Sequence, residues 1–403
     1  MDEAKIRISV QISNEELKRR WTAVRKAMAE RKIDYLVMRN SDQHLGGYIR
    51  WFTDIPGFNG YPTTVVFPRE DEMTVINSGP RMDPQSRMTD LSAKDWAFRG
   101  VKNRWTAPYF TTLDYSRTYD AELVVDLLKP MKRCTVGFVG FSYLPVDFHG
   151  FIVKNLPECT FVSATDLVDE IKAVKSPEEI ALILRCAEMQ DKAMAEVRMK
   201  IKPGMRDSEV TALAQYSCEM QGSEGQLLMC GSAPLGTPSP MLRRHFMNRE
   251  IRKGDHVTLM IEASGPGGYY CELGRVFVMG KASGELLDAM EMAKETQRVT
   301  LKLLKPGADP KELLAASNAF LKSKGLPQDT RLYAHGQGYD LVERPAIRDD
   351  EPMPVRENMN ITVHPIVATP RVFAWVCDNY LVTKDGVGPC IHKTPQQVIE
   401  VDA

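Results

Sequence analysis

Two short stretches of the chain repeat one another and decide the expected fold. Residues 201–210 read "IKPGMRDSEV" and residues 304–313 read "LKPGADPKEL". Each copy has an apolar residue, then Lys-Pro-Gly, then a glutamate followed by an apolar residue. In each copy Pro-Gly ends one helical pattern, and another begins just after it. Strand-rich sequence follows both copies, so the repeat predicts a domain of two related α/β halves, with a site where the halves meet.

The start of this domain is marked by a helix signal within "IKAVKSPEEIALILRCAEMQDKAM", residues 171–194. Ser176 is suited to the N-cap, Pro177 to the first helical position, and Glu179 completes a capping box. Apolar residues then recur at helical spacing. We therefore expect a long helix here and place this domain at residues 171–403.

The preceding residues, 1–170, predict a separate α/β domain with a mixed sheet. An amphipathic helical pattern covers residues 15–31. Short apolar runs rich in β-branched residues, typical of strands, occupy 35–38, 63–67, 73–76 and 134–140. Alternating helical and strand patterns of this kind favour an α/β layer architecture.

Composition excludes several classes of function. The 403 residues carry a formal net charge of −1 and have no strongly basic tract, which argues against nucleic acid or an anionic membrane as the main partner. The eight cysteines include no CxxC pair, which is typical of reduced thiols. No apolar run reaches membrane-spanning length, and the first twenty residues lack the apolar core of a signal peptide. These features predict a cytoplasmic protein.

A histidine in a glycine-rich loop is the first candidate for chemistry. In "LYAHGQGYDLVERP", residues 332–345, two glycines flank one residue just after His335, so the backbone can run close to a ligand. Glu262 and Glu272 lie on expected strands, where burial without partners would be costly. A hydrogen-bonded core histidine and a structural Glu272–Arg275 ion pair are the alternative interpretations.

These stretches resemble the creatinase/aminopeptidase P family, whose pita-bread fold is also found in prolidase and methionine aminopeptidase. Further carriers are "IRKGDHVTLMIEASGPGGYYCELGRVFVMG" (251–280), "ENMNITVHPIV" (357–367) and "CDNYLVTKDG" (377–386), in the family's order between residues 171 and 386. The resemblance implies an N-terminal creatinase-type α/β domain, a pita-bread domain of two pseudo-symmetric halves, and a homodimer.

The resemblance also shows how this chain departs from the family's metal site. The family's metallopeptidases hold two divalent ions with two aspartates, one histidine and two glutamates. In this chain the first matching position falls in the range 260–262, where Glu262 is the chemically sensible occupant. The other matching positions are occupied, in order, by Glu272, His335, His364 and Cys377. Four carboxylates neutralise two dications, whereas here two glutamates and at most one thiolate remain. Hard cations prefer oxygen ligands, so we do not expect a dinuclear centre.

Two alternatives stay open for the chemistry. One is a single zinc or iron ion held by Glu272, His335, His364 and Cys377. The other, which we expect, is no cofactor at all, as in creatinase. Glu262 or Glu272 would then act as base or nucleophile, and His335 or His364 would protonate a leaving nitrogen.

Residues that contact the substrate are also implied by the resemblance. They are Arg275, Tyr270, Arg344, Cys377 and Arg50. In creatinase-like dimers the N-terminal domain of one subunit closes the other's pocket, and Arg50 lies in such a domain. The alternative for Arg50 is a place in an aromatic core, and for Cys377 a small buried apolar side chain. His245 is a further candidate for a pocket histidine.

The resulting expectation is a creatinase-like hydrolase that cleaves a carbon–nitrogen bond of a small polar compound. Three alternatives use the same scaffold. The first is a lyase in which a glutamate abstracts a proton. The second is an Xaa-Pro-type metallopeptidase with altered ligands. The third is a non-catalytic pita-bread protein that binds a peptide or protein.

Overall fold

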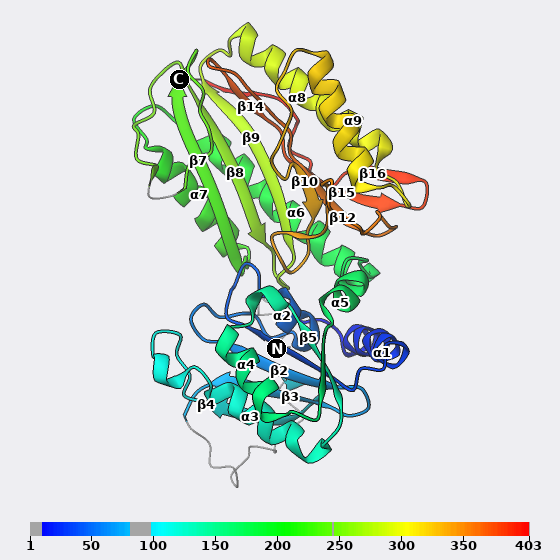
Figure 1. The fold of residues 1–403 in the computed structure, drawn as a ribbon. Helices are drawn as coiled ribbons and strands as arrows, with labels where there is room; N and C mark the ends of the chain where they lie inside the picture. The colour runs from blue at the N-terminus through cyan, green and yellow to red at the C-terminus, as the bar shows by residue number, and fades with distance from the viewer. Residues whose placement is uncertain (1–9, 81–97, 244–245, 403) are drawn as a thin grey trace. The chain divides into compact units, whose positions relative to one another are not determined.

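The computed structural model describes residues 10–80, 98–243 and 246–402, which form two compact units (Figure 1). One unit contains residues 11–172, and the other contains residues 173–402. Residues 1–9, part of the stretch tested for a signal peptide, lie outside the described residues, as does His245. Among the described helices, none combines the length and apolarity needed to cross a bilayer.

The unit of residues 11–172 alternates helices and strands. They are α1 (Asn14–Glu30), β1 (Tyr35–Asn40), α2 (Gly47–Thr53), β2 (Thr63–Pro68), β3 (Met73–Ser78), β4 (Val101–Ala107), α3 (Tyr119–Leu128), β5 (Thr135–Val139), α4 (Val146–Asn155), β6 (Thr160–Ser163) and α5 (Thr165–Lys172). The sheet order is β4-β3-β2-β1-β5-β6. Strand β1 pairs antiparallel with β2 and parallel with β5, so the sheet is mixed, as predicted.

The core of this unit follows from strand alternation. Val37 and Phe138 point from the sheet into a cluster completed by Val124 of α3 and Phe148 of α4, all of them buried. Burying such side chains contributes roughly 1.5–3 kcal/mol each. On the opposite face a Cβ at Gly137 would lie 2.7 Å from the Ala164 side chain, next to α5, so helices cover both faces.

The unit of residues 173–402 repeats one arrangement twice. The first half contains α6 (Pro177–Lys200), α7 (Asp207–Met220), β7 (Gly225–Pro234), β8 (Asp255–Ser264) and β9 (Tyr270–Met279). The second contains α8 (Gly284–Leu303), α9 (Pro310–Ser323), β10 (Ala334–Gly336), β11 (Glu343–Ala346), β12 (Asn360–Val363), β13 (Ile366–Ala368), β14 (Phe373–Trp375), β15 (Asp378–Thr383), β16 (Gly386–Cys390) and β17 (Ile399–Val401). The predicted capping box is present, because Ser176 accepts from the Glu179 N–H and Glu179 accepts from the Ser176 N–H.

The repeated Lys-Pro-Gly turns have equivalent geometry in the two halves. Gly204 and Gly307 adopt φ values of 90° and 86°, which a residue with a side chain rarely adopts. The Gly204 N–H donates to the Ile251 carbonyl at 2.8 Å, and the Gly307 N–H donates to the Val355 carbonyl at 2.8 Å. Each turn therefore ties a helix pair to the strands that follow it. The predicted pair of related α/β halves is present.

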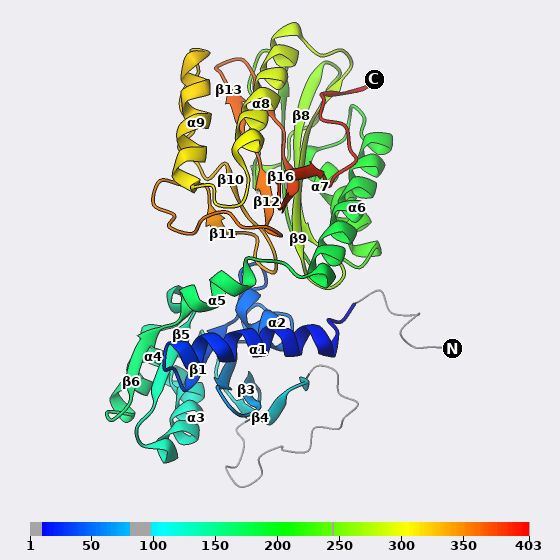
Figure 2. The ribbon, with the colours of Figure 1, turned by 90° about the vertical axis from the view of Figure 1, so that its right-hand side faces the viewer.

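Figure 2 shows the strands of this unit between two helix pairs, α6 and α7 on one side and α8 and α9 on the other. Strands β13 and β14 form a two-stranded sheet. Of the two larger sheets, one has the order β17-β9-β8-β7 and the other the order β11-β10-β12-β15-β16. They meet where Gly274 of β9 forms a bridge with Cys377, just before β15. The carboxylate and histidine candidates lie on these inner strands.

Candidate active site

Two glutamates face each other on the central strands of the first half. Every residue of β8 and β9 is buried, and Glu262 is directly opposite Glu272 in their antiparallel register. Such pairs place Cβ atoms about 4.5–5.5 Å apart. Both side chains are almost fully covered, at 6% and 4% exposure. Two buried carboxyls held this close cannot both ionise without a compensating charge.

Two imidazoles from the second half reach the same place. His335 lies on β10, and His364 follows β12, where its N–H donates to the Tyr333 carbonyl at 2.8 Å. The Nε2 atoms of both rings lie 3.9 Å from Oε2 of Glu272. The ring centroids are 5.2 Å apart. The three side chains therefore form a triangle of nitrogen and oxygen atoms, here called the His-His-Glu triangle.

The tautomer of His335 follows from its neighbour. Its Nδ1 lies 2.9 Å from the Gly336 carbonyl, which can only accept, so Nδ1 carries the hydrogen and Nε2 offers a lone pair toward Glu272. Nε2 of His364 is buried and has no hydrogen-bond partner among the described residues. Both free nitrogen atoms thus point to the interior of the triangle.

Gln337 is a site residue that the sequence analysis did not single out. Its Nε2 donates to Oε1 of Glu262 at 2.8 Å, and its Oε1 accepts from Asn379 at 2.8 Å. Asn379 also accepts from the Glu272 N–H at 2.8 Å. The side-chain amides of Gln337 and Asn379 therefore connect β8 and β9, which carry the two glutamates, with the loop that follows His335. Its position between the two glycines after His335 was the available signal, because a residue there must lie close to the site.

The histidine loop is supported by a buried ion pair. Lys175 Nζ lies 2.5 Å from Oε2 of Glu343, and both side chains are almost fully covered. A Cβ at Gly338 would meet the Glu343 carboxylate at 2.4 Å, so only glycine lets the loop pass this close. We predicted that the glycines after His335 let the backbone run close to a ligand. Gly338 instead lies close to the carboxylate of Glu343, which has a structural role.

Burial sets the protonation of the site. It raises the pKa of Glu272 to about 7, and burial together with the facing Glu272 raises the pKa of Glu262 well above its ordinary value. Burial lowers the pKa of His335 to about 4. It lowers the pKa of His364 well below its ordinary value, with the charges of His335 and Arg331 acting in the same direction. Near neutral pH the rings are neutral and the carboxyl pair retains a proton.

An apolar surface adjoins the carboxylates. Met260, Phe373, Trp375 and Cys377 form a buried cluster, which begins two residue pairs along the sheet from Glu262 and Glu272. A Cβ at position 274 would come within 2.0 Å of the Trp375 ring. Partly buried side chains continue the surface: Leu227, Met229, Met241 and Ile366. These partly buried side chains are the members of the cluster that an apolar group of a ligand could contact.

A family model supplies the decisive comparison, since Metallopeptidase family M24 matches residues 181–384, about half of the chain. The chain belongs to this family. A similar M24 relative is an Xaa-Pro dipeptidase of Pyrococcus horikoshii, 25% identical over 302 residues that cover 72% of this chain and 85% of the relative. An uncharacterized hydrolase/peptidase of Sinorhizobium fredii is 24% identical over 95% of this chain and 96% of its own length.

Solved structures confirm the expected M24 fold. The X-Pro aminopeptidase from Thermotoga maritima aligns with a TM-score of 0.77 and 19% identity, covering 94% of this chain and 99% of that one. A dipeptidase PepE from Mycobacterium ulcerans aligns with a TM-score of 0.75 and 21% identity, covering 98% and 100%. The predicted resemblance to the aminopeptidase P group and the predicted α/β fold class are therefore confirmed.

Arg275 is placed differently from the expectation. Its side chain is fully buried and pairs with Asp378, with Nη2 2.7 Å from Oδ1. Its remaining donors reach the carbonyls of Gly274, Cys377, Thr394 and Pro395. It neither pairs with Glu272 nor has a donor left for a substrate, so it stabilises the junction of the two sheets.

The other proposed substrate contacts occupy varied places. Tyr270 is buried at the start of β9, and its N–H donates to the Gly338 carbonyl at 2.7 Å. Arg344 pairs with Glu351 at 2.5 Å. Arg50 lies in α2, within the unit of residues 11–172, and its predicted contact with a partner's pocket stays a prediction.

The potential metal ligands of this site suit one metal ion better than two. M24 is a family of metallopeptidases, so the expectation that no cofactor is required is not supported. Within the described residues, donor atoms of Glu272, His335 and His364 lie within 4.8 Å of one another, and Cys377 is not in this group. The Cys377 thiol lies 3.4 Å from the Glu272 carbonyl oxygen, and burial raises its pKa well above the ordinary value. These residues fit one ion and lack the carboxylates for two.

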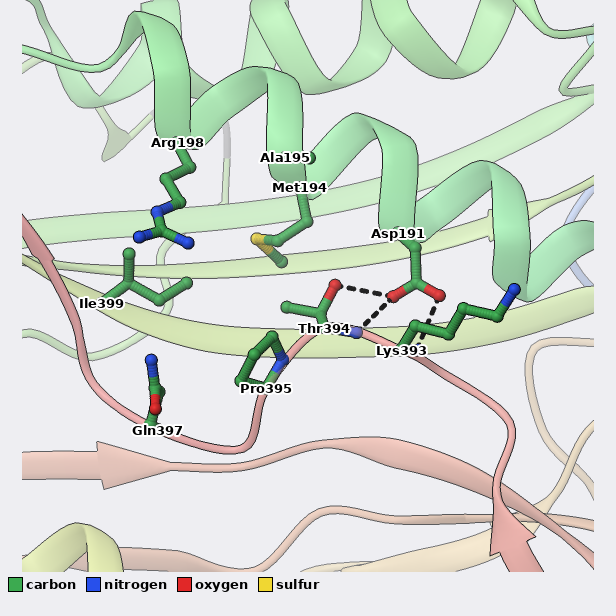
Figure 3. Close-up of a pocket in the computed structure, with 9 residues that line it drawn as sticks. All are labelled: Asp191, Met194, Ala195, Arg198, Lys393, Thr394, Pro395, Gln397 and Ile399. Carbon is green, nitrogen blue, oxygen red and sulfur yellow. Dashed lines mark hydrogen bonds between the residues drawn. The ribbon is translucent and has the colours of Figure 1, made fainter.

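A separate cavity of about 240 Å³ lies between α6 and the C-terminal segment. Figure 3 shows the residues that line it. Asp191 faces it but accepts from the N–H groups of Lys393 and Thr394 at 2.7 and 2.9 Å. Met194 and Ile399 provide apolar lining. The cavity shares no residue with the His-His-Glu triangle, and its one carboxylate serves to anchor the chain.

Proposed function

We propose that this M24 member is a hydrolase that cleaves the C–N bond of a small peptide-like substrate. The observation that supports this most is the convergence of Glu262 and Glu272 with His335 and His364 from the opposite half of the fold. A buried acid–base pair beside neutral imidazoles is the equipment that amide hydrolysis needs. The names of the relatives point to the same class, since several are dipeptidases.

Glu262 is assigned the proton transfers. Gln337 holds its Oε1, which fixes the carboxyl plane while the group exchanges its proton. In the ionised form it takes a proton from the attacking water, and in the protonated form it delivers that proton to the leaving nitrogen. Its raised pKa, caused by burial and by Glu272, suits a group that must both accept and donate near neutral pH.

The His-His-Glu triangle is assigned the positioning of the attacking oxygen. The lone pair on Nε2 of His335 and the carboxylate of Glu272 can accept hydrogen bonds from a water molecule. A divalent ion held here would polarise the substrate carbonyl and acidify water. Burial of all three side chains keeps bulk water from competing for these contacts.

The substrate class follows from the surface beside the carboxylates. The cluster of Met260, Phe373 and Trp375 adjoins the pair and carries no charge. An apolar side chain or ring next to the scissile bond would bury its surface there, at about 25 cal/mol per Å². Dipeptides with one apolar residue, Xaa-Pro dipeptides among them, are therefore the first substrates to test.

A second candidate is the creatinase-like cleavage of a small polar compound. The specific observation in its favour is that His364 and Cys377 stand where the resemblance places glutamate ligands. A site with fewer carboxylates and two neutral imidazoles suits proton transfer to a nitrogen that is not part of a peptide. A lyase reaction uses the same glutamates, and product analysis in ¹⁸O-labelled water separates it, since only hydrolysis incorporates solvent oxygen.

The test is a panel of dipeptides and small ureido or guanidino compounds, assayed with metal-supplemented and chelated protein. We expect turnover of dipeptides with one apolar residue. Glu262→Gln should remove turnover, while His256→Gln, a buried imidazole earlier on β8, should keep it. Turnover of the small polar compounds alone would establish the second candidate. Equal turnover by Glu262→Gln would refute the assigned role.

A further inference from the structure

The buried charges between the two halves fit one dication and not two. Glu262 and Glu272 are opposite each other in the strand register, and together they supply two negative charges when ionised. Arg275, three residues after Glu272, is neutralised by Asp378. Arg331, whose charge acts on Glu272, pairs with Asp329 at 2.7 Å. A single dication balances two carboxylates, whereas two dications would leave a buried excess of two positive charges, which is strongly unfavourable in a low-dielectric interior.

The three donor atoms have the spacing that one ion requires. Oε2 of Glu272 lies 3.9 Å from Nε2 of His335 and 3.9 Å from Nε2 of His364. Ligands about 2.0–2.2 Å from a tetrahedral zinc ion are about 3.3–3.6 Å apart, from the tetrahedral angle. All three donor atoms lie within 4.8 Å of one another, so inward shifts of the three side chains complete the arrangement.

An independent observation shows that the triangle is built for a ligand. Nε2 of His364 is without a hydrogen-bond partner among the described residues, and the side chain is nine-tenths buried, at 10% exposure. Leaving a buried polar atom unsatisfied costs about 1–3 kcal/mol. His335 is held with its lone pair on the same point, because Nδ1 donates to the Gly336 carbonyl, which is the outer contact usual for a metal-bound histidine.

We propose that Glu272, His335 and His364 form a mononuclear centre for one borderline-soft divalent ion, with zinc favoured, in place of a two-ion centre. Two imidazoles and one carboxylate suit zinc or iron better than hard cations such as magnesium or calcium. Three protein ligands leave a position open for water or substrate. Glu262 stays outside the ligand set and free for proton transfer. This inference rests on the proposed function only for the role of the ion in catalysis. Metal binding and substrate turnover are therefore tested by separate measurements.

The test is metal stoichiometry and affinity on the full chain without substrate. Protein freed of metal with a chelator is titrated with Zn²⁺ in competition with a chromophoric indicator. We expect one ion per chain. His364→Gln should weaken binding by more than about 100-fold, since loss of even an outer contact costs about 10–100-fold. Cys377→Ser and the control His256→Gln should bind as the unmodified chain does.

Two ions per chain, no binding, or weakening by Cys377→Ser equal to that of His364→Gln would overturn the proposal. Because His364→Gln could fail to fold, the absorption of Co²⁺ bound to the unmodified chain is a second measurement. A four-coordinate spectrum without a sulfur-to-cobalt charge-transfer band supports the centre, and a strong charge-transfer band contradicts it. One bound ion without turnover of any substrate would refute the proposed function and leave the centre intact.

Discussion

Replacement of Arg275 by methionine tests most fully whether this residue is structural. Both Arg275 and Asp378 are fully buried, and Arg275 together with His392 lowers the pKa of Asp378 to about 2 from 3.8 against the effect of burial. That difference of about 2 units corresponds to about 2 kcal/mol, at 1.36 kcal/mol per unit, which Arg275 and His392 share. The variant also removes four hydrogen bonds to backbone carbonyls, three of which keep a backbone N–H donor. We therefore expect a loss of about 3–5 kcal/mol in unfolding free energy, the range for a broken buried pair.

The pH dependence has a definite sign. A carboxyl whose folded pKa is depressed stabilises the fold above its unfolded pKa and loses that contribution as pH falls through the folded pKa. The advantage of the unmodified chain over Arg275→Met should therefore be full at neutral pH and shrink between about pH 4 and pH 2. Protonation of Asp378 removes the charge that the variant leaves without its arginine partner.

The assay is urea denaturation followed by hydrogen exchange in peptides from β9 and β15, which reports on the unit of residues 173–402 alone. Arg371→Met is the matched control, because Arg371 forms an exposed ion pair with Glu285, at 67% and 42% exposure, which is worth at most about 1 kcal/mol. If Arg275→Met is as stable as this control but raises KM, Arg275 contacts substrate after all and the structural role is wrong.

Three further variants test the site. Glu262→Gln should lower kcat by about 10²–10⁴-fold with little change in KM, measured on a dipeptide that is turned over, and an unchanged kcat would contradict its role in proton transfer. Gly274→Ala places a methyl group 2.0 Å from the Trp375 ring and should lower stability by about 1–3 kcal/mol or more in a thermal melt, unless the ring has room to move. In chelated protein the raised pKa of Glu272, about 7 against 4.5, should make the fold lose stability as pH rises between these values. Glu272→Gln should abolish about 3 kcal/mol of that dependence in urea titrations, and an equal dependence in both proteins would contradict the burial effect.

The fold was predictable because its signals are local. The capping box at Ser176 and the Pro-Gly turns at Gly204 and Gly307 each fix backbone geometry within a few residues, and the structure has all three where the sequence placed them. Such features depend on neighbours in sequence and require no knowledge of tertiary contacts.

The partners of the site residues were less predictable because they depend on contacts across the fold. Glu272 is close to Arg275 in sequence, but Arg275 pairs with Asp378. Asp378 belongs to the other sheet and lies beside Arg275 only because the two sheets meet there. Cys377 follows the family's order yet turns its thiol toward the Glu272 backbone carbonyl. Gln337 entered no prediction, since an amide carries no signal until Glu262 and Asn379 are seen on either side of it.

The most direct measurement is an anomalous difference map from crystals of the zinc-loaded protein, collected on both sides of the zinc absorption edge. We predict one peak, enclosed by Oε2 of Glu272 and the Nε2 atoms of His335 and His364. Two neighbouring peaks bridged by Glu272, or a single peak bound to the sulfur of Cys377, would contradict the mononuclear His-His-Glu centre.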